Sequence, residues 1–287
     1  ALAVVLPRAG NLGGGGFMIV YLAEEKETLA IDYREKAPAG ATRDMFLDEA
    51  GNYDKDKARY SLSSSGVPGT VAGLAYALEN YGTLSWSEVI DPAFRLAQQG
   101  FEVSHDFSHV LDRYKKRLTE DSATAKAYYK QDGNSYLPGE IIQLPDLAST
   151  LKELKEEGPK AFYEGDIADK IVAAMEKDKG LITHNDLKSY SVSLRRPVEG
   201  SYRGYKIVSM PPSSSGGIHL IQMLNILEAH NLEEMGFGSS ESIHLLAEVM
   251  KRAFADRSKY LGDSDFVYVP QEGLISKSYA QELNKKI

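Results

Sequence analysis

The amino-acid sequence predicts an α+β protein in which helices cover a sheet. Apolar residues recur with helical periodicity along most of the chain. Runs of β-branched and aromatic residues are few, and they come in two pairs. No tandem repeat and no low-complexity linker interrupts this pattern. So few strands cannot build a complete two-layer sheet, and we expect another polypeptide to finish it.

The first strand pair follows a run of glycines. Residues 17–23 and 28–33 are apolar and flank a charged turn. This pattern predicts a β-hairpin, and its apolar character predicts that the hairpin is buried. The second pair covers residues 198–210 and bends at Arg203 and Gly204. Glycine at such a bend is typical of a tight turn between two strands.

Capping signals and apolar periodicity mark the helices. Ser85 with Glu88, and Thr183 with Asp186, have the spacing of capping boxes. We expect Pro92 to kink or split the helix that starts after Ser85. Helical periodicity covers residues 69–82, 85–100, 104–118, 145–156, 165–179, 217–229 and 240–262.

The composition narrows the possible functions. The chain has 287 residues, a net charge of −8 and no cysteine. Such an acidic chain does not offer the basic surface that nucleic-acid binding needs. The absence of cysteine excludes disulfides, thiolate zinc sites and a cysteine nucleophile.

The two ends of the chain and one internal stretch give weaker indications of secondary structure. The apolar run at residues 1–6 has no initiator Met and is too short for a signal peptide or a membrane span. We expect this run to be the end of a buried helix, with the true N-terminus upstream. Residues 119–139 form a polar stretch with an expected turn at residues 132–134, and residues 263–287 are expected to be irregular and polar.

Most candidate ligand-binding motifs in the sequence lack the residue spacing that the known motifs require. Gly13, Gly14 and Gly15 lie in a run that lacks the GxGxxG pattern and precedes a strand, whereas phosphate-binding loops precede a helix. The run permits a close approach either to the chain's own backbone or to a substrate. His105 and His109 share a helix face, but no third ligand is evident, so we expect no metal site.

Three serines open a predicted helix. Ser213, Ser214 and Ser215 lie between a proline pair and a glycine pair. Serine hydroxyls in this position often cap the helix. They can also line a pocket at the helix N-terminus, where backbone N–H groups favour an anion. The sequence leaves both interpretations open.

Arg34 is the strongest candidate for ligand binding. It follows a strand with buried character, between Asp32 and Glu35. An arginine in such surroundings needs a partner. That partner is either a neighbouring carboxylate of the chain or the carboxylate of a ligand, which the planar guanidinium can hold with two hydrogen bonds.

Several segments, in order along nearly the whole chain, resemble the γ-glutamyltransferase (glutathione hydrolase) family. They are GNLGGGGFM at residues 10–18, AIDYREKAP at 30–38, GVPGTVAG at 66–73, IDPAFRLAQQGF at 90–101, RGYKIVSMPPSSSGG at 203–217 and ADRSKYLGDSDFV at 255–267. Each segment alone is weak evidence. The ordered set is highly specific.

The resemblance implies an N-terminal-nucleophile hydrolase fold, a four-layer αββα sandwich that a separate small subunit completes. Enzymes of this family are made as one precursor that cleaves itself, and the N-terminal Thr of the small subunit becomes the nucleophile. Residues 1–287 match the large subunit, lacking its beginning and its end, as a single domain shared with the small subunit. No catalytic residue is therefore expected in this chain.

The resemblance also assigns roles. Arg34 matches the residue that binds the α-carboxylate of the γ-glutamyl group, with Asp32 and Glu35 as supporting residues. The loops with Gly13, Gly14 and Gly15 and with the three serines match segments near the site. The implied activity is γ-glutamyl transfer to water or to an amino acid or peptide, without metal or organic cofactor. The implied location is periplasmic or secreted, with no transmembrane segment in this chain.

Three alternatives differ in substrate or in class. A poly-γ-glutamate depolymerase or a cephalosporin-acylase-like enzyme would share the fold. The motif around Arg34 favours a free α-carboxylate and so disfavours bulky acyl groups. A non-catalytic binding relative would require a companion chain without the N-terminal Thr.

Overall fold

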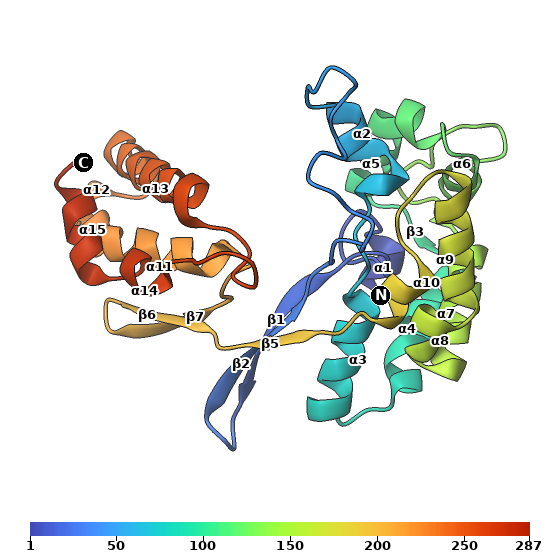
Figure 1. Ribbon diagram of the computed structural model, residues 1–287, viewed down its shortest axis with the longest axis horizontal. Coiled ribbons are helices and arrows are strands. Elements are labelled where there is room, and N and C mark those ends of the chain that lie inside the picture. Colours follow the sequence, from blue (N-terminus) through green and yellow to red (C-terminus); the bar gives the residue numbers. More distant parts are fainter. The chain divides into compact units, whose positions relative to one another are not determined.

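The computed structural model describes residues 1–287 and contains two compact units (Figure 1). The first unit comprises Ala1–Gly16 and Tyr33–Val192, and the second comprises Phe17–Asp32 and Ser193–Ile287. The prediction of a single domain shared with a small subunit stays a prediction.

The first unit is almost entirely helical. Its helices are α1 (Leu2–Val5), α2 (Lys55–Tyr60), η1 (Leu62–Ser64), α3 (Thr70–Tyr81), α4 (Trp86–Gln99), α5 (His105–Leu118), α6 (Ser122–Tyr128), α7 (Pro145–Glu157), α8 (Lys160–Glu164), α9 (Asp166–Lys177) and α10 (His184–Lys188). Two short antiparallel strands, β3 (Phe101–Glu102) and β4 (Ile141–Ile142), lie between them. Helix α4 packs against α7. The largest core cluster of this unit includes Ala97, Ile142 and Leu151, all fully or almost fully buried.

The predicted helix starts of the first unit are confirmed. Both capping boxes form, at the beginning of α4 and of α10. Pro92 lies inside α4 without splitting it. Within the polar stretch at residues 119–139, where the sequence predicts only a turn, α6 forms. The carboxylate of Asp121 accepts a hydrogen bond from the backbone of Thr124 and so caps this short helix.

The second unit combines strands with helices. A three-stranded sheet has the order β1 (Gly16–Leu22), β2 (Glu27–Tyr33) and β5 (Ser193–Arg195), in which β2 and β5 pair antiparallel. A separate hairpin joins β6 (Val198–Tyr202) and β7 (Tyr205–Ser209). The helices are α11 (Gly216–Leu227), α12 (Leu232–Met235), α13 (Ser240–Tyr260), α14 (Gln271–Leu274) and α15 (Lys277–Asn284). Helix α11 packs against β6, α13 and α15.

Two expectations about this unit are corrected. The first hairpin is only half buried: Ile31 on β2 is fully buried, but Tyr21 on β1 is 62% exposed. The C-terminal segment is not an irregular tail, because it forms α14 and α15. Leu274, Ala280 and Leu283 are buried, so a few apolar residues at helical spacing suffice to dock these short helices.

Candidate functional site

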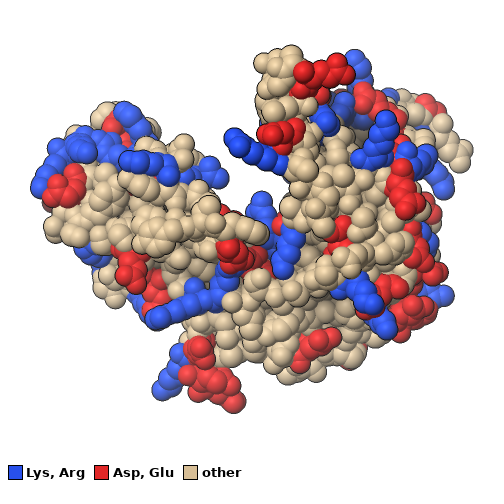
Figure 2. Space-filling model, viewed as in Figure 1, with Lys and Arg blue, Asp and Glu red and all other residues tan.

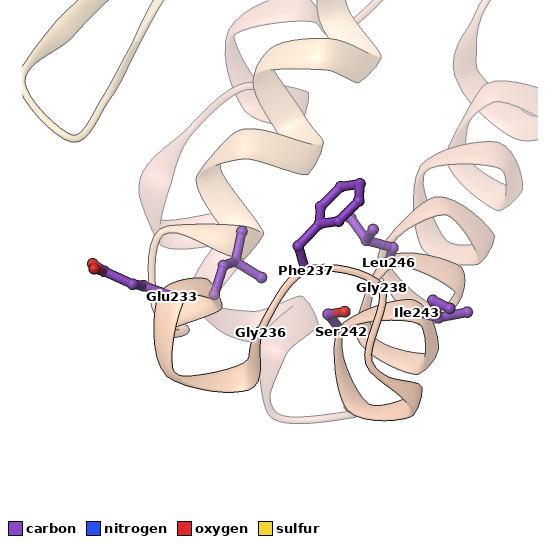
Figure 3. A pocket seen from close by; sticks show the side chains of 8 residues that line it. Glu233, Gly236, Phe237, Gly238, Ser242, Ile243 and Leu246 are labelled. Carbon is purple, nitrogen blue, oxygen red and sulfur yellow. The ribbon is translucent and has the colours of Figure 1, made fainter.

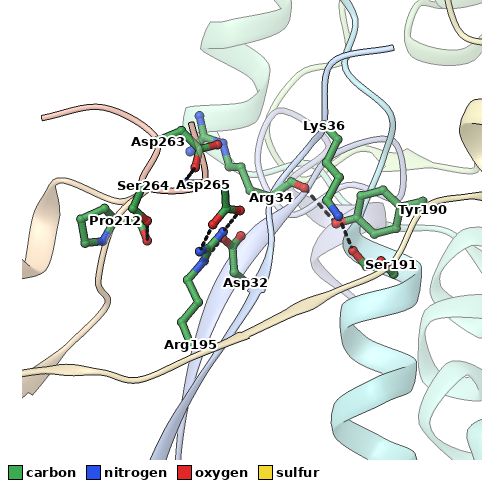
Figure 4. Close-up of polar contacts among 10 residues, drawn as sticks. All are labelled: Asp32, Arg34, Lys36, Tyr190, Ser191, Arg195, Pro212, Asp263, Ser264 and Asp265. Atoms are coloured by element: carbon green, nitrogen blue, oxygen red, sulfur yellow. Dashed lines mark hydrogen bonds and ion pairs between the residues drawn. The ribbon is translucent and has the colours of Figure 1, made fainter. Parts of the chain in front are cut away.

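Arg34 directly follows β2, as the sequence predicts. Its side chain is 62% exposed, and its Nε lies 3.2 Å from Oε2 of Glu35. Its carbonyl oxygen accepts a hydrogen bond of 2.8 Å from the hydroxyl of Tyr190 (Figure 4). The backbone of Arg34 is therefore tied to a distant segment, while its side chain is largely exposed.

Aromatic and cationic side chains hold Tyr190 in place. Its ring stacks on that of Tyr163, with ring centroids 5.8 Å apart. The Nζ of Lys36 lies 5.2 Å from the centre of the Tyr190 ring and donates a hydrogen bond to the carbonyl of Ser191. Tyr163 donates to the carbonyl of Pro68, and burial raises the pKa of Tyr163 to about 12. This phenol is thus a neutral, fixed support for the segment around Arg34.

Two glycine segments pack against the backbone that carries Arg34. A Cβ added to Gly15 would lie 2.6 Å from the carbonyl oxygen of Tyr33 and 2.7 Å from the backbone nitrogen of Glu35. A Cβ on Gly69 would collide with that same Tyr33 oxygen and with the Tyr190 hydroxyl. Only glycine allows this approach.

The predicted close approach of the glycine loop is confirmed at Gly15, and what it approaches is the chain's own backbone. The carbonyl of Gly14 accepts hydrogen bonds from the backbone of Gly69 and Thr70. Gly13 has a looser environment, in which an added Cβ would lie 3.6 Å from Oδ1 of Asn11. Gly15, Glu35 and Arg34 thus form one local cluster in the first unit. Contact of this loop with substrate stays a prediction.

Asp32 belongs to an ion-pair cluster of the second unit. Its Oδ2 accepts a 2.7 Å hydrogen bond from Nε of Arg195, whose two terminal nitrogens each bond Asp265 at 2.7 Å (Figure 4). Arg195 is 14% exposed and Asp32 6%. Hydrogen bonds with Asp265 and then with Asp32 raise the pKa of Arg195, so its charge is permanent.

Sequence reasoning missed Arg195 and Asp265. Arg195 stands beside Arg196 in an ordinary basic pair, and Asp265 stands in a polar loop. No motif of either segment predicts that they pair across 70 positions of the chain. The sequence offered one indication of such a partner. Because β2 has buried character, the carboxylate of Asp32 needs a cation beside it. The supporting role of Asp32 for Arg34 stays a prediction.

The three serines form the turn into α11. The hydroxyl of Ser214 accepts a hydrogen bond of 3.2 Å from the backbone nitrogen of Gly216. Ser215 is the N-cap residue but makes no side-chain cap, and its Oγ instead accepts a bond from Nε of Arg257. The capping interpretation is therefore wrong for Ser215. The side chain of Ser213 lies in the same turn, and a pocket role for the three stays a prediction.

Features of a metal site and of a membrane-spanning helix are missing from this chain. The chain contains no group of three His, Asp or Glu residues arranged to hold a metal ion. No helix is both long and apolar enough to cross a membrane. Figure 2 shows both acidic and basic side chains on the face drawn. The geometry around Arg34 therefore remains the best candidate for ligand binding, and the ligand it suits is a carboxylate.

Comparison with known proteins gives a consistent result. A family model described as Gamma-glutamyltranspeptidase matches residues 1–287. The chain is 47% identical over 287 residues to a glutathione hydrolase proenzyme of Escherichia coli K12, covering all of this chain and 49% of that protein. It is 39% identical to an acylase ACY 1 proenzyme of Pseudomonas sp. V22, covering 98% of this chain and 51% of that protein.

A solved structure shows the same fold. The γ-glutamyltranspeptidase of Helicobacter pylori superposes with a TM-score of 0.96 at 47% identity, over all of this chain and 82% of that chain. The predicted α+β fold of the N-terminal-nucleophile hydrolase type is therefore confirmed. The chain spans about half the length of the curated relatives it matches.

Proposed function

Because the chain belongs to the gamma-glutamyltranspeptidase family, we propose that it is one half of an enzyme that cleaves γ-glutamyl amides such as glutathione. Arg34 binds the α-carboxylate of the γ-glutamyl group. The complementary half supplies the nucleophile, an N-terminal Thr. The acyl group passes to water in hydrolysis, or to an amino acid or peptide in transpeptidation.

One observation carries the role of Arg34. Its side chain is 62% exposed, although its backbone is held by Tyr190 and lies against glycines on the neighbouring segments. A fixed backbone limits where the guanidinium can reach, which lowers the entropy lost when it orients a ligand. Glu35, 3.2 Å from Nε, helps to hold the side chain in one direction.

In this reaction residues 1–287 position the substrate, and the complementary half makes and breaks the covalent bonds. The Thr hydroxyl of the complementary half attacks the γ-carbonyl carbon, and its own α-amino group accepts the proton. The C–N bond then breaks, and the departing amine takes up that proton. Water or an acceptor amine attacks the resulting ester and releases the Thr hydroxyl. Neither step uses a metal ion or an organic cofactor, and Arg34 acts by fixing the glutamyl group near the attacking oxygen.

The comparisons favour a γ-glutamyl substrate over the acyl groups of an acylase. Identity is higher with the glutathione hydrolase of E. coli, at 47%, than with the acylase of Pseudomonas sp. V22, at 39%. An acyl donor without a free α-carboxylate would gain nothing from Arg34. Every residue of poly-γ-glutamate carries a free α-carboxylate, so Arg34 would serve a depolymerase as well, and a substrate panel separates that activity from glutathione hydrolysis.

The partner and the location are part of the same proposal. The curated relatives are named proenzymes, which supports a precursor that is cleaved into a large and a small subunit. We propose that residues 1–287 lie in the large subunit and that the mature protein is periplasmic or secreted.

The test uses the full-length protein and two arginine variants. Wild-type protein should hydrolyse γ-glutamyl-p-nitroanilide, and Arg34→Ala should raise KM strongly while subunit processing is retained. Arg43→Ala is the matched control, because Arg43 lies in the same unit with a side chain that is 96% exposed. Unchanged kinetics in Arg34→Ala would refute its role, and absence of any γ-glutamyl hydrolysis by wild type would refute the function.

A further inference from the structure

The second unit contains a pocket with an almost entirely apolar lining at the start of α13. It has a volume of about 530 Å³ and is lined by the α12–α13 turn and the first turns of α13 (Figure 3). Glu233 is its only charged side chain, and Phe237 in the same lining is fully exposed. Such a lining gives a small ligand no fixed orientation, because orientation needs several polar groups that converge.

A larger pocket lies between the two β-hairpins of the same unit. Its volume is about 820 Å³, which is in the range of small-molecule sites in proteins. One wall comes from the β1–β2 hairpin, and the other comes from the β6–β7 hairpin and the link between β5 and β6. All of its lining residues belong to the second unit. We call it the hairpin pocket.

The hairpin pocket has apolar side chains on both walls. Ile19 and Tyr21 are two positions apart on β1, so they lie on one face of that strand. Their exposed fractions are 40% and 62%, which leaves the aromatic ring of Tyr21 open for stacking. Pro197 and Val208 lie on the other wall. A flat apolar group can therefore pack between the two hairpins.

The charged side chains of the hairpin pocket are unequally paired. Nζ of Lys206 lies 3.0 Å from Oε1 of Glu199, so these two charges neutralise each other. Lys26 and Arg196 line the same pocket and take part in no ion pair. Glu27 is the only other carboxylate of the lining. One positive charge is thus in excess, and it suits a ligand with a single negative charge.

The backbone at Lys26 has an uncommon conformation. Its φ angle is 55°, in the left-handed region that glycine and asparagine adopt more readily than lysine. It ends the turn between β1 and β2 and places a cation in the lining of the pocket. Backbone strain of this kind is concentrated at ligand-binding and active sites. The strain at Lys26 is therefore an observation that supports ligand binding, independent of the charge count.

We propose that the hairpin pocket binds a small amphipathic monoanion, a carboxylate with an aromatic or branched aliphatic body. Arg196 holds the carboxylate through its planar guanidinium, and Lys26 adds a second cation. Tyr21 and Ile19 pack against the body of the ligand. A compact, multiply charged anion such as phosphate would exceed the excess charge and leave the apolar walls unfilled. The proposal goes beyond the proposed function, because the pocket shares no residue with the cluster around Arg34.

A titration of the full-length, processed protein with indole-3-acetate, followed by ligand-observed NMR, tests this. The probe combines a flat apolar ring with one carboxylate. We expect saturable binding with a Kd of about 1 mM or tighter, as is usual for a ligand of this size. Indole-3-acetamide, which has the same shape without the charge, should bind at least about tenfold more weakly. Inorganic phosphate should also bind at least about tenfold more weakly.

Two variants test the cations. Arg196→Gln and Lys26→Gly should each weaken the binding of indole-3-acetate by at least about fivefold. Lys26→Gly should leave the melting temperature unchanged or raise it, because glycine adopts the left-handed conformation without strain. Lower affinity in a protein that is no less stable is a result that a purely structural role of Lys26 would not give. Arg43→Gln is the matched control, since this exposed cation lies outside the pocket and should leave the Kd unchanged.

Arg34→Ala separates this proposal from the proposed function, because the variant should bind indole-3-acetate as tightly as wild type does. Loss of binding in Arg34→Ala, with unchanged binding in Arg196→Gln, would place the carboxylate at Arg34 and overturn the proposal. Equal Kd values for the acid and its amide would also overturn it, as would phosphate binding of equal strength or no saturable binding up to about 10 mM probe. Binding that depends on Arg196 in a protein without γ-glutamyl activity would uphold the pocket while the proposed function fails.

Discussion

The two units of the chain differ in where their large apolar side chains remain exposed. In the first unit they are scattered, as at Leu84 and Leu137, which is normal for a surface. In the second unit they gather on α13 and on the loop that follows it, where Phe266 and Tyr268 are more than 80% exposed. The first unit therefore buries its apolar surface by itself, whereas the second has surface that this chain leaves uncovered.

The same two units use arginine in opposite ways. The side chain of Arg34 in the first unit is 62% exposed, while that of Arg195 in the second is 14% exposed and bonds two carboxylates. A buried, fully bonded arginine specifies structure, and an exposed arginine on a fixed backbone can bind a ligand. Residue type alone does not distinguish a structural arginine from a ligand-binding one. The burial of the side chain and the support of its backbone do.

The largest expected effect comes from removing the buried arginine. Arg195→Ala leaves the carboxylate of Asp32 buried without this partner, and we expect the free energy of unfolding to fall by about 3–5 kcal/mol. Urea unfolding of the purified full-length protein measures it. Arg196→Ala is the control, since the neighbouring arginine is exposed and should change stability little. If Arg195→Ala and Arg196→Ala change stability equally, Arg195 has no special structural role, and its contrast with Arg34 fails.

A smaller effect is expected where glycine meets the segment of Arg34. Gly69→Ala forces its Cβ against the Tyr33 carbonyl and the Tyr190 hydroxyl, so the backbone must shift, at a cost of about 1–3 kcal/mol. KM for γ-glutamyl substrates should rise as well, because Arg34 follows Tyr33. Gly40→Ala is a suitable control, since its Cβ would approach nothing closer than 3.8 Å. A normal KM in a folded Gly69→Ala protein would show that the glycines do not position Arg34.

Tyr190→Phe should have a still smaller effect. It removes the hydrogen bond to the Arg34 carbonyl but keeps the ring that stacks on Tyr163. We expect a loss of about 1 kcal/mol in stability and a rise of a few fold in KM, with kcat nearly unchanged. A change in kcat without a change in KM would argue that Tyr190 does not act through Arg34.

The smallest expected effect concerns a buried histidine of the second unit. His219 is 6% exposed and stacks on Phe254, and burial lowers its pKa. The nearby cation Arg257 also lowers this pKa, whereas Gln222 and Asp256 partly oppose the shift. As the pH falls below about 6.5, the histidine of the unfolded chain binds a proton before His219 of the folded chain does. The contribution of neutral His219 to the free energy of unfolding is therefore present above about pH 6.5 and is lost as the pH drops through the lower pKa of the folded state. Unfolding measured from pH 8 to pH 5 should show a steeper loss for wild type than for His219→Gln, and parallel curves would disprove the assignment.

Long elements with clear boundaries were predictable from the sequence. Helices α3, α4, α5, α7, α9 and α13 carry periodic apolar residues over three or more turns, and Ser85, Ser104 and Ser239 cap three of them as serine can. Short elements were not predictable, because α6, α8, α14 and α15 contain too few residues for periodicity to emerge. Their stability comes from tertiary contacts such as those of Phe162 and Leu274.

The candidate site was predictable only in its central residue. Arg34 stands out because a cation follows a buried strand. The partners that hold it are separated from it by long stretches of chain, as the 156 positions between Arg34 and Tyr190 show. Contacts of that kind depend on how the whole unit folds, and no local pattern of residues encodes them.

The central claim is that Arg34 binds the α-carboxylate of the substrate, and one measurement that changes both the enzyme and the substrate tests it most directly. The kcat/KM values of wild type and Arg34→Ala are compared for γ-glutamyl-p-nitroanilide and for the analogue in which the α-carboxylate is a carboxamide. Two charge-assisted hydrogen bonds predict that wild type prefers the carboxylate by about 100-fold or more, and that Arg34→Ala loses this preference. If both proteins prefer the carboxylate equally, another residue binds it and the account is contradicted.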